Sequence, residues 1–351
     1  MYTTQYNGHN VLYFNNLQPI ALECGNTLQS AQIAYHTYGK LNAAKDNVVW
    51  VCHAFTANSD AADWWPNMIG SGLLLDTDKY FVVCANIIGS CYGSTGPLSA
   101  NPATQKPYYR SFPEVTIRDM VMAHEQLRQF LGIPKIKIML GGSIGAFQAL
   151  EWSIMYPQVV QSLVISACGA RTTPWVTALN ETQRMAIEAD ATFFDDLPHG
   201  GSKGLAAARA IALTSYRNYA TYNTTQEDPA HNKLNNYKVC SYQRHQGEKL
   251  VRRFDAYSYY RLTQAMDSFD VARGRGNAVE KVLQQIIIPT LVIGISTDTL
   301  FPVCEQKWIA QHIPHAAYRE VDSPFGHDGF LIENKKLTAA ISGFINNTFE
   351  A

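Results

Sequence analysis

Two short segments place a serine between glycines in a spacing that serine nucleophiles use. Residues 141–145 read Gly-Gly-Ser-Ile-Gly, with Ser143 at the centre, and residues 200–204 read Gly-Gly-Ser-Lys-Gly, with Ser202 at the centre. A nucleophilic serine needs a sharp strand-to-helix turn that raises its hydroxyl above the sheet. It also needs small neighbours, so that strand and helix can approach each other at that turn. The chemistry available to such a serine is acyl transfer or ester hydrolysis.

The flanking residues distinguish the two serines. The apolar segment at 136–140 predicts a buried strand before Ser143, and apolar residues at helical spacing predict a helix over 144–156 after it. Ser202 instead follows Phe-Phe-Asp-Asp-Leu-Pro-His, which indicates a loop that starts a helix. We therefore predict that Ser143 is the nucleophile. A phosphate-binding turn at Ser143 is the alternative, but neither a P-loop lysine nor a G-x-G-x-x-G motif follows.

A serine hydroxyl reacts readily only beside a base that an acid orients. In serine enzymes built on an open α/β sheet, the acid and then the histidine follow the serine along the chain, on loops after later strands. Asp298 follows the strand-like Leu-Val-Ile-Gly-Ile, and His327 follows Tyr-Arg-Glu-Val. Because parallel strands end at one edge of a sheet, we predict a catalytic triad of Ser143, Asp298 and His327. His53 precedes the serine and His124 lies on a predicted helix, so neither is assigned a catalytic role.

The tetrahedral intermediate of acyl transfer carries a negative oxygen that needs two backbone N–H donors. In this type of site one donor is the residue after the nucleophile, here Ile144. The other belongs to the loop after the third strand, here Cys-His-Ala-Phe-Thr, which makes Phe55 the expected second donor.

Elements that could position these residues recur along the chain. Short apolar runs predict strands at 47–52, 80–86, 136–140, 162–166, 288–295 and 316–321, and helical spacing predicts helices at 116–132, 144–156, 304–313 and from about 335. This alternation predicts an α/β fold with a mostly parallel sheet covered by helices on both faces. The alternation lapses in the middle of the chain. We therefore expect one core domain from 1–170 and 285–351, with a helical lid inserted at 171–284.

Composition excludes several classes of function. Among 351 residues the net charge is −1, which offers no basic surface for nucleic acid or an anionic membrane. No signal peptide and no run of about 18 apolar residues is found. The 7 cysteines are scattered without a C-x-x-C pair, which favours free thiols in a reducing cytoplasm over disulfides or a zinc site. We expect a cytoplasmic protein without a bound metal or cofactor.

Five segments resemble one family of acyltransferases. They are VVWVCHAFTANSDAADWW, FVVCANIIGSCYGSTGPLSANPATQKPYYRSFPEVTIRDMV, GGSIGAFQALEW, SYQRHQGEKLVRRFDAYSYYRLTQAMD and DSPFGHDGFLIE. Together they resemble homoserine O-acetyltransferases, the α/β-hydrolase-fold enzymes of methionine biosynthesis, from about residue 10 to about residue 345. The NIIGSCYGSTGP block is the most specific, since a generic esterase has no reason to carry it. The resemblance implies a homodimer formed through the helical insertion.

The resemblance also implies a reaction. An acyl group, acetyl above all, would pass from acyl-CoA to Ser143 and then to the γ-hydroxyl of L-homoserine in a ping-pong reaction, with His327 as base and acid. Arg217 matches the family's arginine for the homoserine carboxylate, Asp328 its acid for the ammonium, and Tyr242 is a third substrate contact. Structural roles are the alternatives: a surface cation for Arg217, a helix N-cap for Asp328 and a packing aromatic for Tyr242.

This chain departs from the family immediately after the nucleophile. The usual segment has Met after the serine and then Gly-Gly-Met, whereas Ile144 to Phe147 read Ile-Gly-Ala-Phe here. Any residue but proline supplies the N–H at 144, but the pocket for the acyl group could differ. Succinyl transfer, serine as acceptor and ester hydrolysis with the same triad therefore stay open. A different kind of hypothesis is that the protein is a receptor without catalytic activity, and the complete set of Ser143, Asp298 and His327 argues against it.

Overall fold

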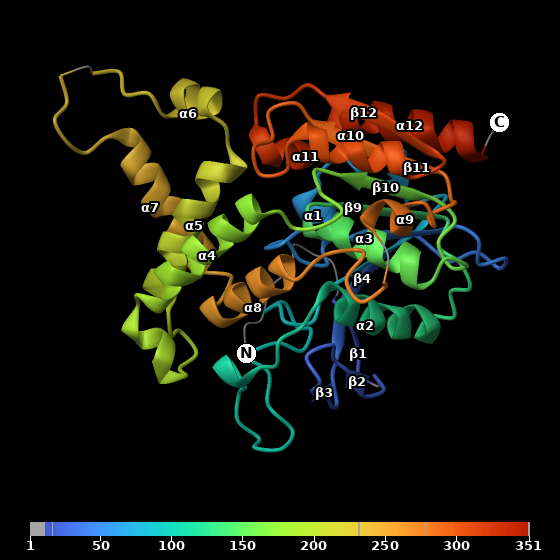
Figure 1. Ribbon diagram of the computed structural model, residues 1–351, viewed down its shortest axis with the longest axis horizontal. Helices are drawn as coiled ribbons and strands as arrows, with labels where there is room; N and C mark the ends of the chain where they lie inside the picture. The colour runs from blue at the N-terminus through green and yellow to red at the C-terminus, as the bar shows by residue number, and fades with distance from the viewer. Residues whose placement is uncertain (1–10, 16, 231, 277, 350–351) are drawn as a thin grey trace.

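The computed structural model describes residues 11–15, 17–230, 232–276 and 278–349 of the chain. Its centre is an eight-stranded sheet with the order β1-β4-β8-β5-β9-β10-β11-β12 (Figure 1). The six strands from β8 to β12 in this order run parallel to one another, whereas β4 pairs antiparallel with both β8 and β1 at one edge. In sheet order the strands are Leu12–Phe14, Ile33–Tyr38, Phe81–Ala85, Val48–Cys52, Ile138–Gly142, Leu163–Ser166, Thr290–Ile295 and Ala316–Val321. The predicted mostly parallel sheet is confirmed.

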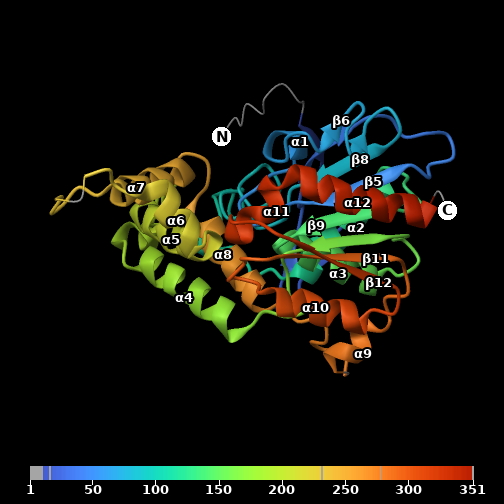
Figure 2. The ribbon, with the colours of Figure 1, turned by 90° about the horizontal axis from the view of Figure 1, so that it is seen from above.

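The sheet has a hydrophobic layer on each face because side chains alternate along each strand. In β5, Trp50 packs into one cluster, whereas Val49 and Val51 pack into the other. The first face is covered by α2 (Ile117–Phe130), α3 (Ile144–Met155), α9 (Val279–Leu283) and α10 (Val303–His312). The second face is covered by α1 (Ala61–Trp64), α11 (Gly329–Ile332) and α12 (Asn334–Phe349) (Figure 2).

Two strands of the main sheet and two separate two-stranded sheets were not expected from the sequence. Strand β4 contains His36 and Thr37, which interrupt its apolar pattern, and β1 is only three residues long. The separate pairs are β2 (Ile20–Ala21) with β3 (Thr27–Leu28), and β6 (Ile69–Gly70) with β7 (Leu75–Asp76). Strands β1 and β4 extend the main sheet at one edge, whereas the two small sheets lie outside it.

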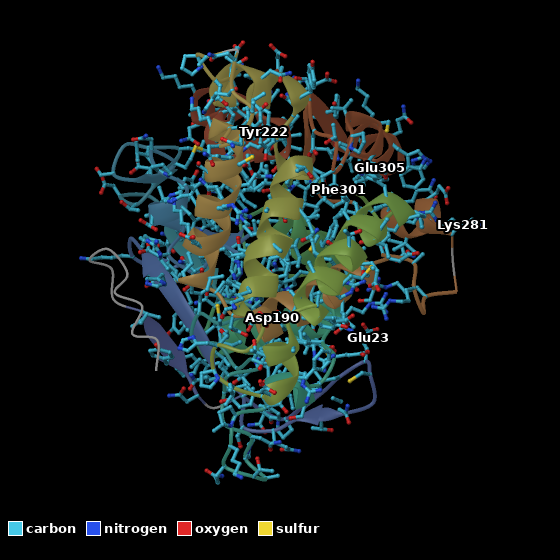
Figure 3. The ribbon with its side chains drawn as sticks, turned by 90° about the vertical axis from the view of Figure 1, so that its left-hand side faces the viewer. Glu23, Asp190, Tyr222, Lys281, Phe301 and Glu305 are labelled. Carbon is cyan, nitrogen blue, oxygen red and sulfur yellow. The ribbon has the colours of Figure 1, made fainter. Side chains whose placement is uncertain are left out.

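The segment predicted as a lid, 171–284, contributes no strand to the sheet within the residues described. It forms helices beside the sheet, at the left of Figure 1 and facing the viewer in Figure 3: α4 (Pro174–Glu188), α5 (Ser202–Tyr216), α6 (Tyr219–Gln226), α7 (Lys238–Val251) and α8 (Ala256–Asp267), followed by α9 on the sheet. Arg171 and Asp270 pair in an isolated bridge where the chain leaves the sheet and returns to it. The ring of Tyr259 on α8 meets Phe55 edge to face, so these helices contact the core near the expected site.

Three further features concern membranes, thiols and metals. In the described ranges, no helix has both the length and the apolarity that a membrane crossing requires. All seven cysteines lie in these ranges and are unpaired. The described residues contain no group of three or more His, Cys, Asp or Glu side chains that could hold a metal ion.

Candidate active site

Ser143 occupies a strained turn between β9 and α3. Its backbone has φ 56° and ψ −130°, a conformation that few residues other than glycine adopt without cost. A Cβ at Gly141 would lie 2.3 Å from the carbonyl oxygen of Gly145, and a Cβ at Gly145 would lie 2.2 Å from that of Cys52. Both glycines are therefore required for strand and helix to approach. The turn has the strand–turn–helix form expected for a nucleophile.

The side chains of Ser143, His327 and Asp298 form a hydrogen-bonded chain. His327 Nε2 lies 3.0 Å from Ser143 Oγ, and His327 Nδ1 lies 2.7 Å from Asp298 Oδ2. Since a carboxylate can only accept, Nδ1–H donates to Asp298 and the free Nε2 faces the serine hydroxyl. All three residues are at most 5% exposed. This arrangement can remove a proton from Ser143 as its oxygen attacks a carbonyl carbon.

Hydrogen bonds to the backbone fix the positions of Asp298 and His327 relative to each other. The other oxygen of Asp298, Oδ1, accepts from the N–H groups of Leu300 and Phe301 at 2.8 and 2.9 Å. Thr297 donates its hydroxyl to the Ser323 carbonyl at 2.6 Å and accepts the Gly326 N–H at 3.0 Å. The loops after β11 and β12 are thereby joined next to Asp298 and His327.

The surroundings of His327 favour its charged form. Burial lowers the pKa of the imidazole, but the charge and hydrogen bond of Asp298 together with the charge of Asp328 outweigh that effect, so the pKa is raised above 6.5. The rings of Tyr216, Phe301 and Phe330 lie around the imidazole with centroids 5.3–5.7 Å away. The base is therefore shielded from water on several sides and can hold a proton during the reaction.

Within the residues that the structure describes, the two expected to donate to the oxyanion, Ile144 and Phe55, both have a backbone N–H without an acceptor. Ile144 is the first residue of α3, so its N–H has no acceptor one turn back in the helix. Phe55 lines the same cavity as Ser143. The hydrogen bonds found in the described part of the chain leave the Phe55 N–H without an acceptor. Two free donors beside the serine are what a tetrahedral oxyanion requires.

A cavity of about 400 Å³ opens over the serine and is lined by both the core and the lid helices. Ser143, Phe55, His327, Arg217 and Asp328, all named from the sequence, line it. Sequence reasoning missed other lining residues, among them Trp64 and three residues of the lid segment: Arg209, Tyr216 and Arg253. The adjacent Trp64 and Trp65 could have indicated an aromatic wall of the site, but only the fold shows that Trp64 is the one that lines the cavity.

Arg217 and Asp328 form an ion pair on the wall of this cavity. The Nε of Arg217 lies 3.2 Å from Oδ2 of Asp328, and the two side chains are 25% and 17% exposed. Burial raises the pKa of Asp328, while the positive charges of Arg217 and His327 oppose that rise. Asp328 precedes α11, but its side chain makes no N-cap hydrogen bond there, so its partner is Arg217 rather than the helix end.

Two residues named from the sequence lie away from the cavity. Tyr242 is not among its lining residues; it lies on α7, with its ring edge-on to that of Tyr222 at 6.2 Å. The structure therefore shows no contact of Tyr242 with the cavity over Ser143. Of the two rings, that of Tyr222 lies nearer the ion pair, since the charges of Arg217 and Asp328 influence its pKa, which burial raises.

Ser202 begins α5 and donates its hydroxyl to the His199 carbonyl at 2.6 Å, as suits a helix start.

Comparison with known proteins places this geometry in a family. A family model described as the alpha/beta hydrolase fold matches residues 47–333. The chain is 44% identical over 327 residues to a homoserine O-acetyltransferase of Cyclobacterium marinum, covering 93% of each chain. Among solved structures, a homoserine O-acetyltransferase from Bacillus anthracis has a TM-score of 0.87 at 24% identity, covering 95% of this chain and 97% of that one.

Esterase E22 has the same TM-score of 0.87 and the same 24% identity, with 96% of this chain and 99% of that one covered. The backbone alone therefore does not separate transfer from hydrolysis. The distinction comes from the C. marinum acetyltransferase, to which the chain is 44% identical over 93% of each chain. The chain belongs to the α/β-hydrolase fold family and, within it, to the family of homoserine O-acetyltransferases.

Proposed function

We propose that this protein transfers an acetyl group from acetyl-CoA to the γ-hydroxyl of L-homoserine through an acetyl-Ser143 intermediate. One observation carries the proposal: the hydrogen-bonded chain from Ser143 through His327 to Asp298 opens into a cavity that also holds the Arg217–Asp328 ion pair. The triad supplies acyl chemistry, and two opposite charges suit a zwitterionic amino acid. The names of the curated relatives support acetyl as the group transferred.

The first half of the reaction acylates the enzyme. Ser143 Oγ attacks the thioester carbonyl carbon while its proton passes to His327 Nε2, and Asp298 stabilises the imidazolium. The N–H groups of Phe55 and Ile144 stabilise the oxyanion. The C–S bond then breaks, the proton moves from His327 to the sulfur, and CoA leaves as the thiol.

The second half regenerates the serine. The γ-hydroxyl of homoserine attacks the acetyl carbonyl carbon of the intermediate and gives its proton to His327. As the bond to Ser143 breaks, the proton returns to Oγ and O-acetylhomoserine leaves. The guanidinium of Arg217 would bind the substrate carboxylate, and the carboxylate of Asp328 would bind its ammonium group.

Hydrolysis is the second candidate, favoured by the equal structural likeness to esterase E22. Water could attack the same acyl-serine from the position of the homoserine hydroxyl. An esterase for neutral esters has no use for a paired cation and anion beside its serine, so the Arg217–Asp328 pair favours transfer. The lid helices, which line the cavity together with the core, would limit the access of water.

Mass spectrometry of the intact protein after mixing with acetyl-CoA tests the proposal. We expect an adduct of one acetyl group on Ser143 that disappears when homoserine is added, with O-acetylhomoserine formed in equal amount. The matched control is Ser143→Ala, which should form no adduct. Succinyl-CoA in place of acetyl-CoA tests the donor, because a faster succinyl adduct would overturn the choice of acetyl. Release of free CoA at the same rate with and without homoserine would instead identify a hydrolase.

A further inference from the structure

His53 lies immediately before the loop that supplies an oxyanion donor, and hydrogen bonds hold its ring at both nitrogens. Nδ1 lies 2.8 Å from the carbonyl oxygen of Ala54, and the N–H of Ile87 donates to Nε2 at 3.2 Å. Since the Ile87 N–H can only donate, Nε2 must accept, and the ring proton is on Nδ1. His53 therefore donates to the Ala54 carbonyl. The residue is 0% exposed, and burial lowers the pKa of its imidazole to about 4, so the ring stays neutral.

The Ala54 carbonyl and the Phe55 N–H belong to the same peptide group. The described part of the chain contains no cis peptide bond, so this group is trans and planar, and its N–H points away from its C=O. Two donors hold the carbonyl oxygen, His53 Nδ1 at 2.8 Å and the Ala57 N–H at 3.0 Å. Fixing the carbonyl in this way also fixes the direction of the Phe55 N–H on the opposite side. A hydrogen bond to the carbonyl further polarises the N–H and makes it a stronger donor.

A buried amide from α3 ties the same segment to the nucleophile. The Nε2 of Gln148 lies 3.3 Å from the carbonyl oxygens of His53 and Ile144. Gln148 is 0% exposed, and it therefore links the two segments that carry the expected oxyanion donors. The His53 ring and this amide therefore hold two neighbouring carbonyls, those of Ala54 and His53, at the start of the loop after β5.

We propose that His53 is a positioning residue that orients the Phe55 N–H towards the oxyanion formed at Ser143. The proposal rests on the function proposed above, since it concerns the donor that the acyl transfer uses. Because the same oxyanion site serves acylation and deacylation, loss of the His53 hydrogen bond weakens both transition states. It leaves the binding of acetyl-CoA and homoserine unchanged.

His124 provides a matched comparison within the same core. It is also 0% exposed, and its Nε2 lies 3.3 Å from the Asn86 carbonyl oxygen, but its ring makes no hydrogen bond to the loop with Ala54 and Phe55 among the described contacts. Its ring packs beside those of Trp50 and Trp152, with centroids 6.2 and 6.1 Å away. His124→Gln keeps a donor near the position of Nε2, so the Asn86–Ile87 peptide group, whose N–H donates to His53, stays hydrogen-bonded while the core packing changes.

Two variants of His53 separate orientation from packing. In His53→Asn, the amide nitrogen stands near the position of Nδ1 and can donate to the Ala54 carbonyl. In His53→Gln, the amide reaches the position of Nε2, where its oxygen can accept from Ile87, and the bond to Ala54 is lost. We expect kcat and both kcat/KM values of the Gln variant to fall together by about 10- to 100-fold, with either KM changed by less than about threefold. The Asn variant and His124→Gln should keep kcat within a few-fold of the wild type.

Equal losses in the Asn and Gln variants, or a wild-type kcat in the Gln variant, would overturn the positioning role. If the Gln variant unfolds at the assay temperature, single-turnover acylation at a lower temperature, normalised to folded protein, gives the same comparison. The wild-type acetyl adduct separates the two proposals. Without an adduct on wild-type Ser143 the proposed function fails, whereas an adduct that forms at the same rate in His53→Gln contradicts only the role of His53.

Discussion

Arg217 and Asp328 come from different parts of the chain and meet at 3.2 Å in the cavity that Ser143 also lines. Arg217 ends helix α5 of the lid segment, and Asp328 directly follows His327 on the core. The Nε–H of Arg217 is buried yet makes no well-aligned hydrogen bond. The contact with Asp328 is therefore an ion pair without the two parallel hydrogen bonds of a bidentate arginine–carboxylate pair. The guanidinium therefore retains donors for a second, planar anion. A substrate carboxylate would complete this arrangement.

Arg217→Ala tests the carboxylate contact. We expect the KM for homoserine to rise about 10- to 100-fold, because a charge-assisted hydrogen bond to a buried anion contributes about 1.5–3 kcal/mol. Rapid-mixing measurements of acetyl-CoA acylation should show little change, since the thioester does not need this cation. Arg217→Lys serves as the control that keeps the charge and loses the fork. Loss of acylation in proportion to transfer would contradict the assigned contact.

Asp298→Asn tests the origin of the raised pKa of His327. The base acts only when neutral, so wild-type kcat should fall as the pH drops through the His327 pKa, which lies above 6.5. Removing the anion removes the main influence that raises this pKa, so the acid limb of the variant should move to lower pH. Its maximal kcat should fall by about 10³–10⁴-fold, as in other serine triads. A pH profile from 5 to 9 that keeps its midpoint would show that Asp298 does not set the pKa.

The triad could be predicted from sequence because each member follows an apolar run of strand length. Ser143, Asp298 and His327 stand just past β9, β11 and β12, where parallel strands end at one edge. Gly141 and Gly145 marked the turn, and their close backbone contacts explain why no larger residue fits. Local pattern and the order of strands were sufficient in this case.

Other parts of the site depend on contacts between distant segments. Strand β4 was missed because His36 looks like a surface residue; in the fold it is buried, with Nδ1 2.8 Å from the hydroxyl of Ser59. Trp64 and Arg253 line the cavity only because the loop after β5 and the lid meet there. Tyr242 does not line this cavity, since the direction of α7 cannot be read from its own residues, and its contact with substrate stays a prediction. Packing between elements, rather than propensity within them, decides these positions.

Glu151 holds an ionic cluster that fastens the segment after α8 to the core. Its side chain is 1% exposed and accepts from Arg118 Nε at 2.7 Å and from Arg275. Glu151→Gln leaves two partly buried cations with one anion fewer, so the free energy of unfolding should fall by about 2–4 kcal/mol. Urea unfolding measures this, and kcat per folded molecule should not change.

The exposed pair of Glu248 and Arg252, whose side-chain atoms lie 4.0 Å apart, is the control for that variant. Glu248→Gln should alter the free energy of unfolding by less than about 0.5 kcal/mol, because solvent screens such a pair. Equal effects of the two substitutions would mean that burial of the Glu151 cluster adds nothing to stability.

His124 should make the fold sensitive to mild acid. Burial lowers the pKa of its imidazole to about 3, whereas in the unfolded chain the ring takes up a proton near pH 6.5. Below that pH the unfolded state binds more protons, so the contribution of the neutral ring to stability is lost progressively as the pH falls towards 3. His124→Gln cannot titrate, and its free energy of unfolding should therefore drop by about 2 kcal/mol less than that of the wild type between pH 7 and pH 5. Urea midpoints at the two pH values measure the difference, and parallel losses in both proteins would place the acid sensitivity elsewhere.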